Sequence, residues 1–166
     1  MTSTKPDNTQ IDMHISSESP NFCITTTEME MFLNIPNADV DHILSKFCKP
    51  EYGMGLCTEP SAGCVEIYGD LYIDEDPEMI WDVWRSDIVN FVEIVFGSLI
   101  VNSTRWTDLS PLKNLKYVVQ MEDKPAIMIV NNRRLSDVAL PSLTRVRSSN
   151  ERPVVIEDNM FNVTLL

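Results

Sequence analysis

Two glycine-centred segments of the sequence share one pattern. The first is Ile67-Tyr-Gly-Asp-Leu-Tyr-Ile73 and the second is Val95-Phe-Gly-Ser-Leu-Ile-Val101. In both segments apolar residues recur at every second position, which is the period of a half-buried β-strand. A third copy, Met128-Ile-Val130, matches Leu99-Ile-Val101 at an offset that is longer by a single position. Repeats of about 20 to 50 residues that each carry a strand indicate a solenoid.

The segments behind these strands repeat as well. Asn102 follows the second strand and Asn131-Asn132 follows the third, and asparagine suits tight corners because it tolerates left-handed backbone angles. Pro111 and Pro141 come later and favour short turns over long helices. A fourth strand, Val154–Glu157, precedes Asp158-Asn159. The spaced apolar residues that we expect to form the opposite wall of the core are Leu109, Leu112, Leu115, Val138, Leu140 and Leu143.

Stacking of the strands predicts which side chains form the core. No strand can bury its apolar face alone, but neighbouring coils bury one another. Gly69 and Gly97 are expected where the backbone bends or where two backbones approach closely. The predicted inward columns are Leu71, Leu99 and Met128, followed by Ile73, Val101 and Val130.

The outward positions of these strands are also aromatic or aliphatic. We expect Tyr68 to stack beside Phe96, and Tyr72 to stack beside Ile100 and then Ile129. A contiguous exposed apolar patch is typical of an interaction site, so these five residues are the candidate ligand-binding residues. The alternative is that another segment or domain covers this face.

Four segments together resemble the receptor L domain, the ligand-binding solenoid of the insulin and EGF receptor ectodomains. They are Cys64-Val-Glu-Ile-Tyr-Gly-Asp-Leu-Tyr-Ile73, Gly97-Ser-Leu-Ile-Val-Asn102, Leu112-Lys-Asn-Leu-Lys-Tyr117 and Ile129-Val-Asn-Asn-Arg-Arg-Leu135. The resemblance covers residues 57–166 and is greatest to nematode proteins that carry such domains without a kinase. It implies a mainly β, right-handed β-helix-like solenoid, which some schemes class as a leucine-rich-repeat-like α/β solenoid.

The resemblance also implies a non-catalytic protein in an extracellular setting or in a receptor ectodomain, without a cofactor. The expected partner is a growth-factor-like peptide or a receptor, which the protein would bind as a module or as a decoy that lowers the free ligand. The sequence contains no nucleophile elbow, phosphate-binding glycine loop or zinc-protease motif, which agrees with this expectation. The alternative is an intracellular solenoid adaptor, or a truncated product without activity of its own.

The N-terminal segment, residues 1–56, is interpreted as the end of a preceding, truncated L domain. Asn21-Phe-Cys-Ile-Thr25 parallels Met160-Phe-Asn-Val-Thr164, which places a closing rung at residues 11–25. A capping segment would follow, with a short helix predicted over Val40–Phe47 and Asp39 as its N-cap. The alternative is a plain N-terminal extension that folds over the end of the solenoid.

The resemblance implies a pairing for the four cysteines. It pairs Cys23 with Cys48 and Cys57 with Cys64, although four cysteines allow two other connectivities. The cysteine spacing contains no C-x-x-C and suits disulfides better than zinc, so no metal site is expected. Free thiols are the competing outcome if the chain stays in a reducing cytosol.

Charge and hydropathy restrict the partners and the compartment. The net charge of −12 opposes binding to nucleic acid and to anionic lipid. The sequence shows no secretory signal, and its apolar runs are far shorter than the roughly 18 to 20 residues that span a bilayer. Asn102 and Asn162 begin N-x-S/T sequons and are candidate glycosylation sites, which would require the secretory pathway.

Two further patterns have both a structural and a functional interpretation. Apolar residues at helical spacing between Glu78 and Phe91 predict an amphipathic turn packed on the solenoid, rather than a tryptophan-lined pocket. Five arginines in the mildly basic C-terminal third are expected to form a solvated edge. The alternative is that they face the acidic middle of a second molecule; they are Arg133, Arg134, Arg145, Arg147 and Arg152.

Overall fold

The computed structural model describes residues 10–50, 55–74 and 87–160. The chain divides into two compact units, residues 1–49 and residues 50–166. Each unit is built from parallel strand pairs, and each is considered by itself below.

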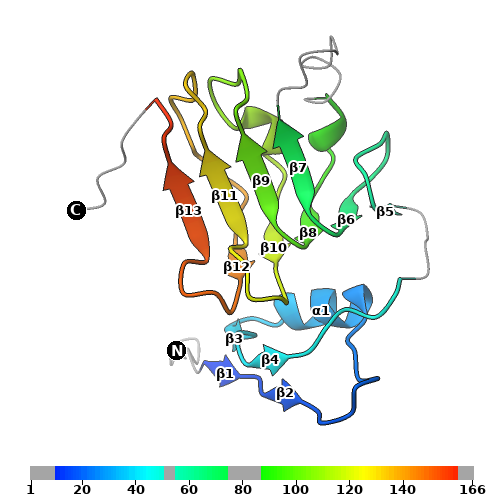
Figure 1. Cartoon of the computed structure of the whole chain (residues 1–166). Coiled ribbons are helices and arrows are strands. Elements are labelled where there is room, and N and C mark those ends of the chain that lie inside the picture. The colour runs from blue at the N-terminus through cyan, green and yellow to red at the C-terminus, as the bar shows by residue number, and fades with distance from the viewer. Residues whose placement is uncertain (1–9, 51–54, 75–86, 161–166) are drawn as a thin grey trace, which may run out of the picture. The chain divides into compact units, whose positions relative to one another are not determined.

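The second unit is a β-solenoid with two parallel sheets (Figure 1). Every strand in it pairs with the equivalent strand of the next coil, so the sheets run along the stack. One sheet has the order β12-β10-β8-β6-β5 and contains Arg145–Arg147, Tyr117–Val119, Ile94–Phe96, Glu66–Tyr68 and Leu56–Cys57. The other has the order β13-β11-β9-β7 and contains Val154–Glu157, Ile127–Val130, Leu99–Asn102 and Leu71–Asp74. The predicted mainly β solenoid is confirmed.

The core lies between these two sheets and a third wall of turns. Leu109, Leu112 and Leu115 are almost fully buried in this wall, and the short 3₁₀-helix η1 (Ser110–Leu112) carries Pro111 in its first turn. Val138, Leu140 and Leu143 are partly buried against the same core. The predicted opposite wall and its short turns are therefore confirmed.

The strand register differs from the prediction in the third copy. Leu71 pairs with Leu99, which pairs with Ile127; Ile73 pairs with Val101, which pairs with Ile129. The offset from β9 to β11 therefore equals the offset from β7 to β9, and the predicted inward placement of Met128 and Val130 is wrong. Every residue of Ile127–Val130 is apolar, so alternation within this strand does not show which side chains face inward. A shift by a single position exchanges the two faces of a strand.

One corner of the solenoid depends on two stacked glycines. Gly69 joins β6 to β7 with a φ of +108°, a conformation that residues with a side chain rarely adopt. Gly97 lies at the same corner of the next coil, and a Cβ atom added there would be 2.3 Å from the Gly69 carbonyl oxygen. The predicted close approach of two backbones is therefore confirmed at this corner.

The opposite corner is held by a ladder of buried polar side chains. Asn132 is fully buried, and its Oδ1 accepts hydrogen bonds from the backbone N–H and the hydroxyl of Thr104 at 2.9 and 2.8 Å. Its Nδ2 donates to the Val101 carbonyl at 3.0 Å and to Asn159 Oδ1 at 2.9 Å. Asn132 thereby connects three successive coils through one amide group.

The residue before each ladder position has a left-handed backbone. The φ angles of Ser103, Asn131 and Asp158 are 54°, 59° and 53°. The corner equivalent to Asn131-Asn132 is therefore Ser103-Thr104, a single position later than the sequence comparison placed it. Asparagine and aspartate tolerate this conformation better than most residues with a side chain.

The predicted amphipathic turn between Glu78 and Phe91 lies mostly outside the described residues. Residues 87–89 form a helical turn, and Val89 and Val92 are buried in the core. Phe91 is 55% exposed.

Among its described residues, the first unit contains two short parallel pairs and one helix. β1 (Ile11–Asp12) pairs with β3 (Ala38–Asp39), and β2 (Ile15–Ser16) pairs with β4 (Ile43–Leu44). Ile24 forms a further parallel bridge to Phe47. Two consecutive stretches of chain therefore run alongside each other, as neighbouring coils do.

The helix of this unit is α1 (Thr26–Leu33), not the predicted helix over Val40–Phe47. Thr25 and Glu28 form a reciprocal capping box, and the hydrogen bonds from Thr25 lower the pKa of the Glu28 carboxyl. In the predicted helical segment, Ile43 and Leu44 pair with β2. Apolar spacing alone favours a helix there, but parallel pairing with the preceding coil gives the segment a β conformation.

Both disulfides implied by the resemblance are present. Cys23 bonds to Cys48 across a sequence separation of 25 residues, and Cys57 bonds to Cys64 across 7. No cysteine is free.

The glycine corner yields a prediction about stability. We expect Gly97→Ala to lower the free energy of unfolding by about 3 kcal/mol, because the new Cβ would collide with backbone atoms rather than with a movable side chain. Gly63→Ala is the matched control, since no atom lies within 4 Å of its added Cβ and only its φ of +86° is unfavourable. Urea denaturation measures both, and an equal loss for the two variants would contradict the close-contact explanation.

The asparagine ladder yields a second prediction. We expect Asn132→Ala to lower the free energy of unfolding by about 2 to 4 kcal/mol, because it leaves buried groups of Thr104, Val101 and Asn159 without partners. Asn131→Gly, at the exposed neighbouring position with positive φ, should cost less than about 1 kcal/mol. Thermal and urea unfolding of both variants test the prediction, which fails if Asn131→Gly is the more damaging change.

Candidate functional site

The outward face of the β7-β9-β11-β13 sheet carries a row of apolar side chains, which we call the outward stripe. Tyr72 pairs with Ile100, Ile100 with Met128, and Met128 with Val155. Tyr72 is 59% exposed, Ile100 and Met128 are partly buried, and Val155 is only 7% exposed. Exposure therefore decreases along the row, and the most accessible residue lies on the edge strand β7.

A hollow lies beside the exposed end of this stripe. It has a volume of about 540 Å³ and includes Asp70 and Tyr72 of the β7 segment. Thr58, Glu59 and Pro60 contribute to its lining, as do Ile73, Ile88 and Val89. Tyr72 can thus contact a bound molecule with its aromatic ring while a neighbouring group enters the hollow.

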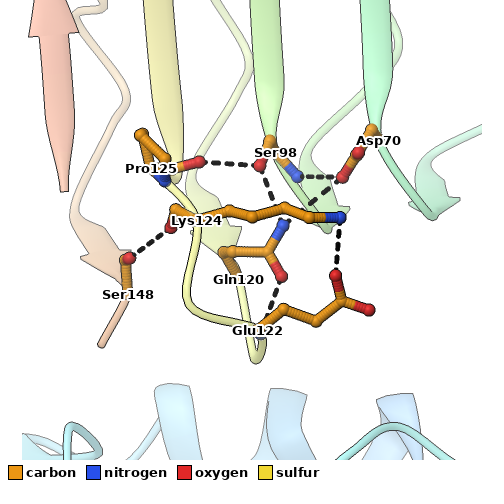
Figure 2. Close-up of polar contacts among 7 residues, drawn as sticks. All are labelled: Asp70, Ser98, Gln120, Glu122, Lys124, Pro125 and Ser148. Carbon is orange, nitrogen blue, oxygen red and sulfur yellow. Dashed lines mark hydrogen bonds and ion pairs between the residues drawn. The ribbon is translucent and has the colours of Figure 1, made fainter. Parts of the chain in front are cut away.

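A polar cluster surrounds the beginning of the same strands (Figure 2). Asp70 Oδ1 accepts a hydrogen bond from the Ser98 backbone N–H at 2.8 Å and one from Gln120 Nε2 at 3.4 Å. Gln120 Nε2 also donates to Ser98 Oγ at 2.8 Å, and Ser98 Oγ donates to the Pro125 carbonyl at 2.7 Å. The loop between β10 and β11 is thereby tied to the starts of β7 and β9.

Two exposed charges lie on that loop. Lys124 Nζ is 2.5 Å from a carboxylate oxygen of Glu122, and Figure 2 shows the lysine side chain reaching over toward Asp70. Its hydrogen bond with Glu122, and then the negative charges of Glu122 and Asp70, raise the pKa of Lys124. A positive charge next to two carboxylates therefore marks one end of the outward face, adjacent to Tyr72.

The structure separates the five sequence-predicted ligand-binding residues into two sheets. Tyr72 and Ile100 lie together in the outward stripe, and Tyr68 pairs with Phe96 in the other sheet, as predicted. Phe96 is only 2% exposed, so its predicted exposure is wrong. Ile129 is 1% exposed and packs in the core, so its outward placement is also wrong.

Met128 is the residue that the register places where Ile129 was expected. A constant repeat length would have identified it, because Met128 is as far from Ile100 in the sequence as Ile100 is from Tyr72. Glu122 and Lys124 lie in a corner loop that has no counterpart in the two preceding coils, and no repeat pattern points to them.

The structure describes one of the two candidate glycosylation sites. Asn102 is partly exposed at the end of β9, and its Oδ1 accepts hydrogen bonds from Ser103 Oγ and Asn131 Nδ2, both at 3.1 Å. Asn162 lies outside the described residues. Modification of either residue stays a prediction.

The other side chains that could bind a metal ion do not gather into a site in the part of the chain that the structure describes. Within residues 10–50, 55–74 and 87–160, no three His, Cys, Asp or Glu side chains are grouped so as to hold a metal ion. The imidazole rings of His14 and His42 stack with their centroids 4.6 Å apart. No helix among the described residues is long and apolar enough to span a membrane.

Comparison with known proteins agrees with the stacked coils, the disulfides and the two sheets. The family model of the receptor L domain matches residues 63–165. No curated protein and no solved structure matches the chain. The matched residues comprise most of the chain and nearly all of the solenoid, from the turn before β6 to beyond β13. The protein therefore belongs to the receptor L domain family, the ligand-binding modules of receptor ectodomains.

Proposed function

We propose that this protein binds a growth-factor-like peptide or a receptor through the outward face of the β7-β9-β11-β13 sheet, without catalysing a reaction. The observation that supports the proposal most directly is the outward stripe. Its largest member, Tyr72, is 59% exposed although it lies in a regular strand next to apolar neighbours. An exposed aromatic residue at the end of an apolar row is typical of a protein-binding surface.

The local charges support a polar boundary around this contact. Lys124, Glu122 and Asp70 lie beside the stripe and carry charges of both signs. Interfaces commonly combine an apolar centre with such a polar rim, which adds specificity rather than most of the affinity. The partner should therefore present an apolar group for Tyr72 and the hollow, with charged groups around it.

The proposed location is outside the cell, in a receptor ectodomain or in a secreted decoy. Two disulfides in a small protein support this proposal, because disulfides form and persist in oxidising compartments. The competing function is that of an intracellular adaptor, in which the four cysteines would be free thiols. The N-terminal unit is proposed to be the closing part of a preceding L domain.

Substitution of Tyr72 tests the binding face. We expect Tyr72→Ala to weaken binding to an insulin-like or EGF-like peptide by about 30-fold, because truncation removes the exposed aromatic anchor. Met128→Asp should weaken it similarly by placing a charge in the apolar row. Biolayer interferometry with the immobilised protein and a panel of such peptides measures the change.

Phe91→Ala is the matched control for that experiment. Phe91 is an aromatic residue of similar exposure, at 55%, and it lies outside the strands of the outward face. Its substitution should leave affinity within about twofold, a change of under about 0.5 kcal/mol. Undiminished binding by both Tyr72→Ala and Met128→Asp would refute this face as the site, and no binding to any peptide of the panel would refute the ligand class.

Disulfide mapping tests the proposed compartment. Peptide mapping by mass spectrometry without reduction should recover Cys23 linked to Cys48 and Cys57 linked to Cys64 in protein isolated from its source. Loop-closure entropy for separations of 25 and 7 residues predicts that reduction costs about 3.5 and about 2.5 kcal/mol of stability. Four free thiols in the isolated protein would instead favour the intracellular adaptor.

A further inference from the structure

A second hollow lies at the corner where β9, β11 and β13 end. Its volume is about 780 Å³, and its lining includes three arginines, Arg105, Arg133 and Arg134. The remaining lining residues are Ser103, Thr104, Asn131 and Asp158. We call this the arginine corner, and it is separate from Tyr72 and the hollow beside it.

The asparagine ladder fixes the arginines in register. Arg105 directly follows Thr104, and Arg133 directly follows Asn132, whose Oδ1 accepts two hydrogen bonds from Thr104. The two arginines therefore begin from equivalent positions on adjacent coils, about 4.8 Å apart along the stack. Arg134 adds a third guanidinium at the next position of the chain.

Two of these three positive charges, those of Arg133 and Arg134, are not paired within the described part of the chain. Among the residues that the structure describes, the exposed side chains of Arg133 and Arg134 have no ion pair and no hydrogen bond. Asp158 lines the same hollow, but its carboxylate forms no ion pair with either of them. The guanidinium groups of Arg133 and Arg134 are therefore available for charge-assisted hydrogen bonds to a bound anion.

The donors at this corner suit a tetrahedral oxyanion. Each guanidinium offers five N–H donors in a planar fork, and one fork already satisfies both oxygens of a carboxylate. A sulfate or phosphate monoester offers three acceptor oxygens, which suits the two guanidinium groups of Arg133 and Arg134 in the same hollow. The number of arginines that line the hollow therefore favours an ester of this kind over an acidic side chain.

The other lining groups suit hydroxyls. The Asp158 carboxylate accepts hydrogen bonds, and the Ser103 hydroxyl and the Asn131 amide both donate and accept them. A carboxylate beside the arginines also disfavours a ligand that is anionic along its whole length. We propose that the arginine corner binds a sulfated or phosphorylated saccharide, with the ester group on the arginines and ring hydroxyls near Asp158.

Isothermal titration calorimetry on the full chain tests this inference. The probes are glucose 6-sulfate and glucose 6-phosphate, each compared with unmodified glucose as its ester-free partner. We expect at least one ester-bearing probe to bind at 50 mM NaCl, its ester-free partner not to bind, and 300 mM NaCl to weaken binding. Whichever ester binds more tightly identifies the source of the oxyanion.

Two variants and a matched control locate the site. Arg133→Gln and Arg134→Gln should each weaken binding about tenfold or more, as expected for loss of a charge-assisted hydrogen bond. Lys113→Gln removes one exposed positive charge outside the hollow and should change affinity less than twofold. Unchanged melting temperatures show that the variants are folded, and Tyr72→Ala should leave saccharide affinity unchanged.

Several results would overturn the inference. Equal binding of ester-bearing and ester-free probes would show that the ester group is not recognised. Equal weakening by Lys113→Gln and Arg133→Gln would show that binding depends on the overall charge of the protein and not on the arginine corner. Tighter binding of a hexaglutamate peptide than of either ester would make the ligand an acidic peptide. Absence of binding to all probes would also reject the proposal, and none of these results would affect the peptide-binding proposal for the outward stripe.

Discussion

The in-register contact between successive coils is the constraint on which the solenoid depends. At one corner Gly97 lies so close to the Gly69 carbonyl that no Cβ fits between them. At the opposite corner the Asn132 amide bonds to the coil before it and to the coil after it. A change in length between these corners would move the inward columns out of register, so the equal repeat lengths from β7 to β9 and from β9 to β11 follow from both contacts.

Because inward side chains and corners carry the fold, the outward positions can serve binding. The outward stripe begins at the exposed Tyr72 and ends at the buried Val155, which gives a single sheet both an accessible and a protected end. The polar cluster around Asp70 lies where these strands start, and the arginine corner lies where they end. One sheet therefore carries two chemically different surfaces without any change in its core, and solenoid domains commonly carry function on such outward positions.

The fold can be predicted from the sequence at positions where the residue type has only one plausible structural role. The two glycines and the spaced leucines predict the corner and the opposite wall, and the family resemblance implies both cysteine pairs. Prediction from the sequence fails where neighbouring positions are chemically alike. Ile129 and Met128 are both apolar, so residue type does not show which one faces outward, and the hydrogen-bonded register with Ile100 assigns that position to Met128. Lys124 and Glu122 belong to a loop without a repeat, and their position next to Tyr72 depends on tertiary structure.

The N-terminal unit has few coils and therefore a small apolar core. The strands that the structure describes in it form two-stranded pairs. The buried apolar side chains among the same residues are Ile24, Met29, Leu33, Ala38, Val40 and Ile43. In a core of this size, the free energy gained by apolar burial offsets little more than the conformational entropy lost on folding. Small units of this kind therefore usually need a cross-link. The Cys23–Cys48 bond provides one, directly beside the bridge between Ile24 and Phe47. Two coils that depend on a disulfide fit the closing end of a longer stack better than an independent domain, which supports the proposal that this unit completes a preceding L domain.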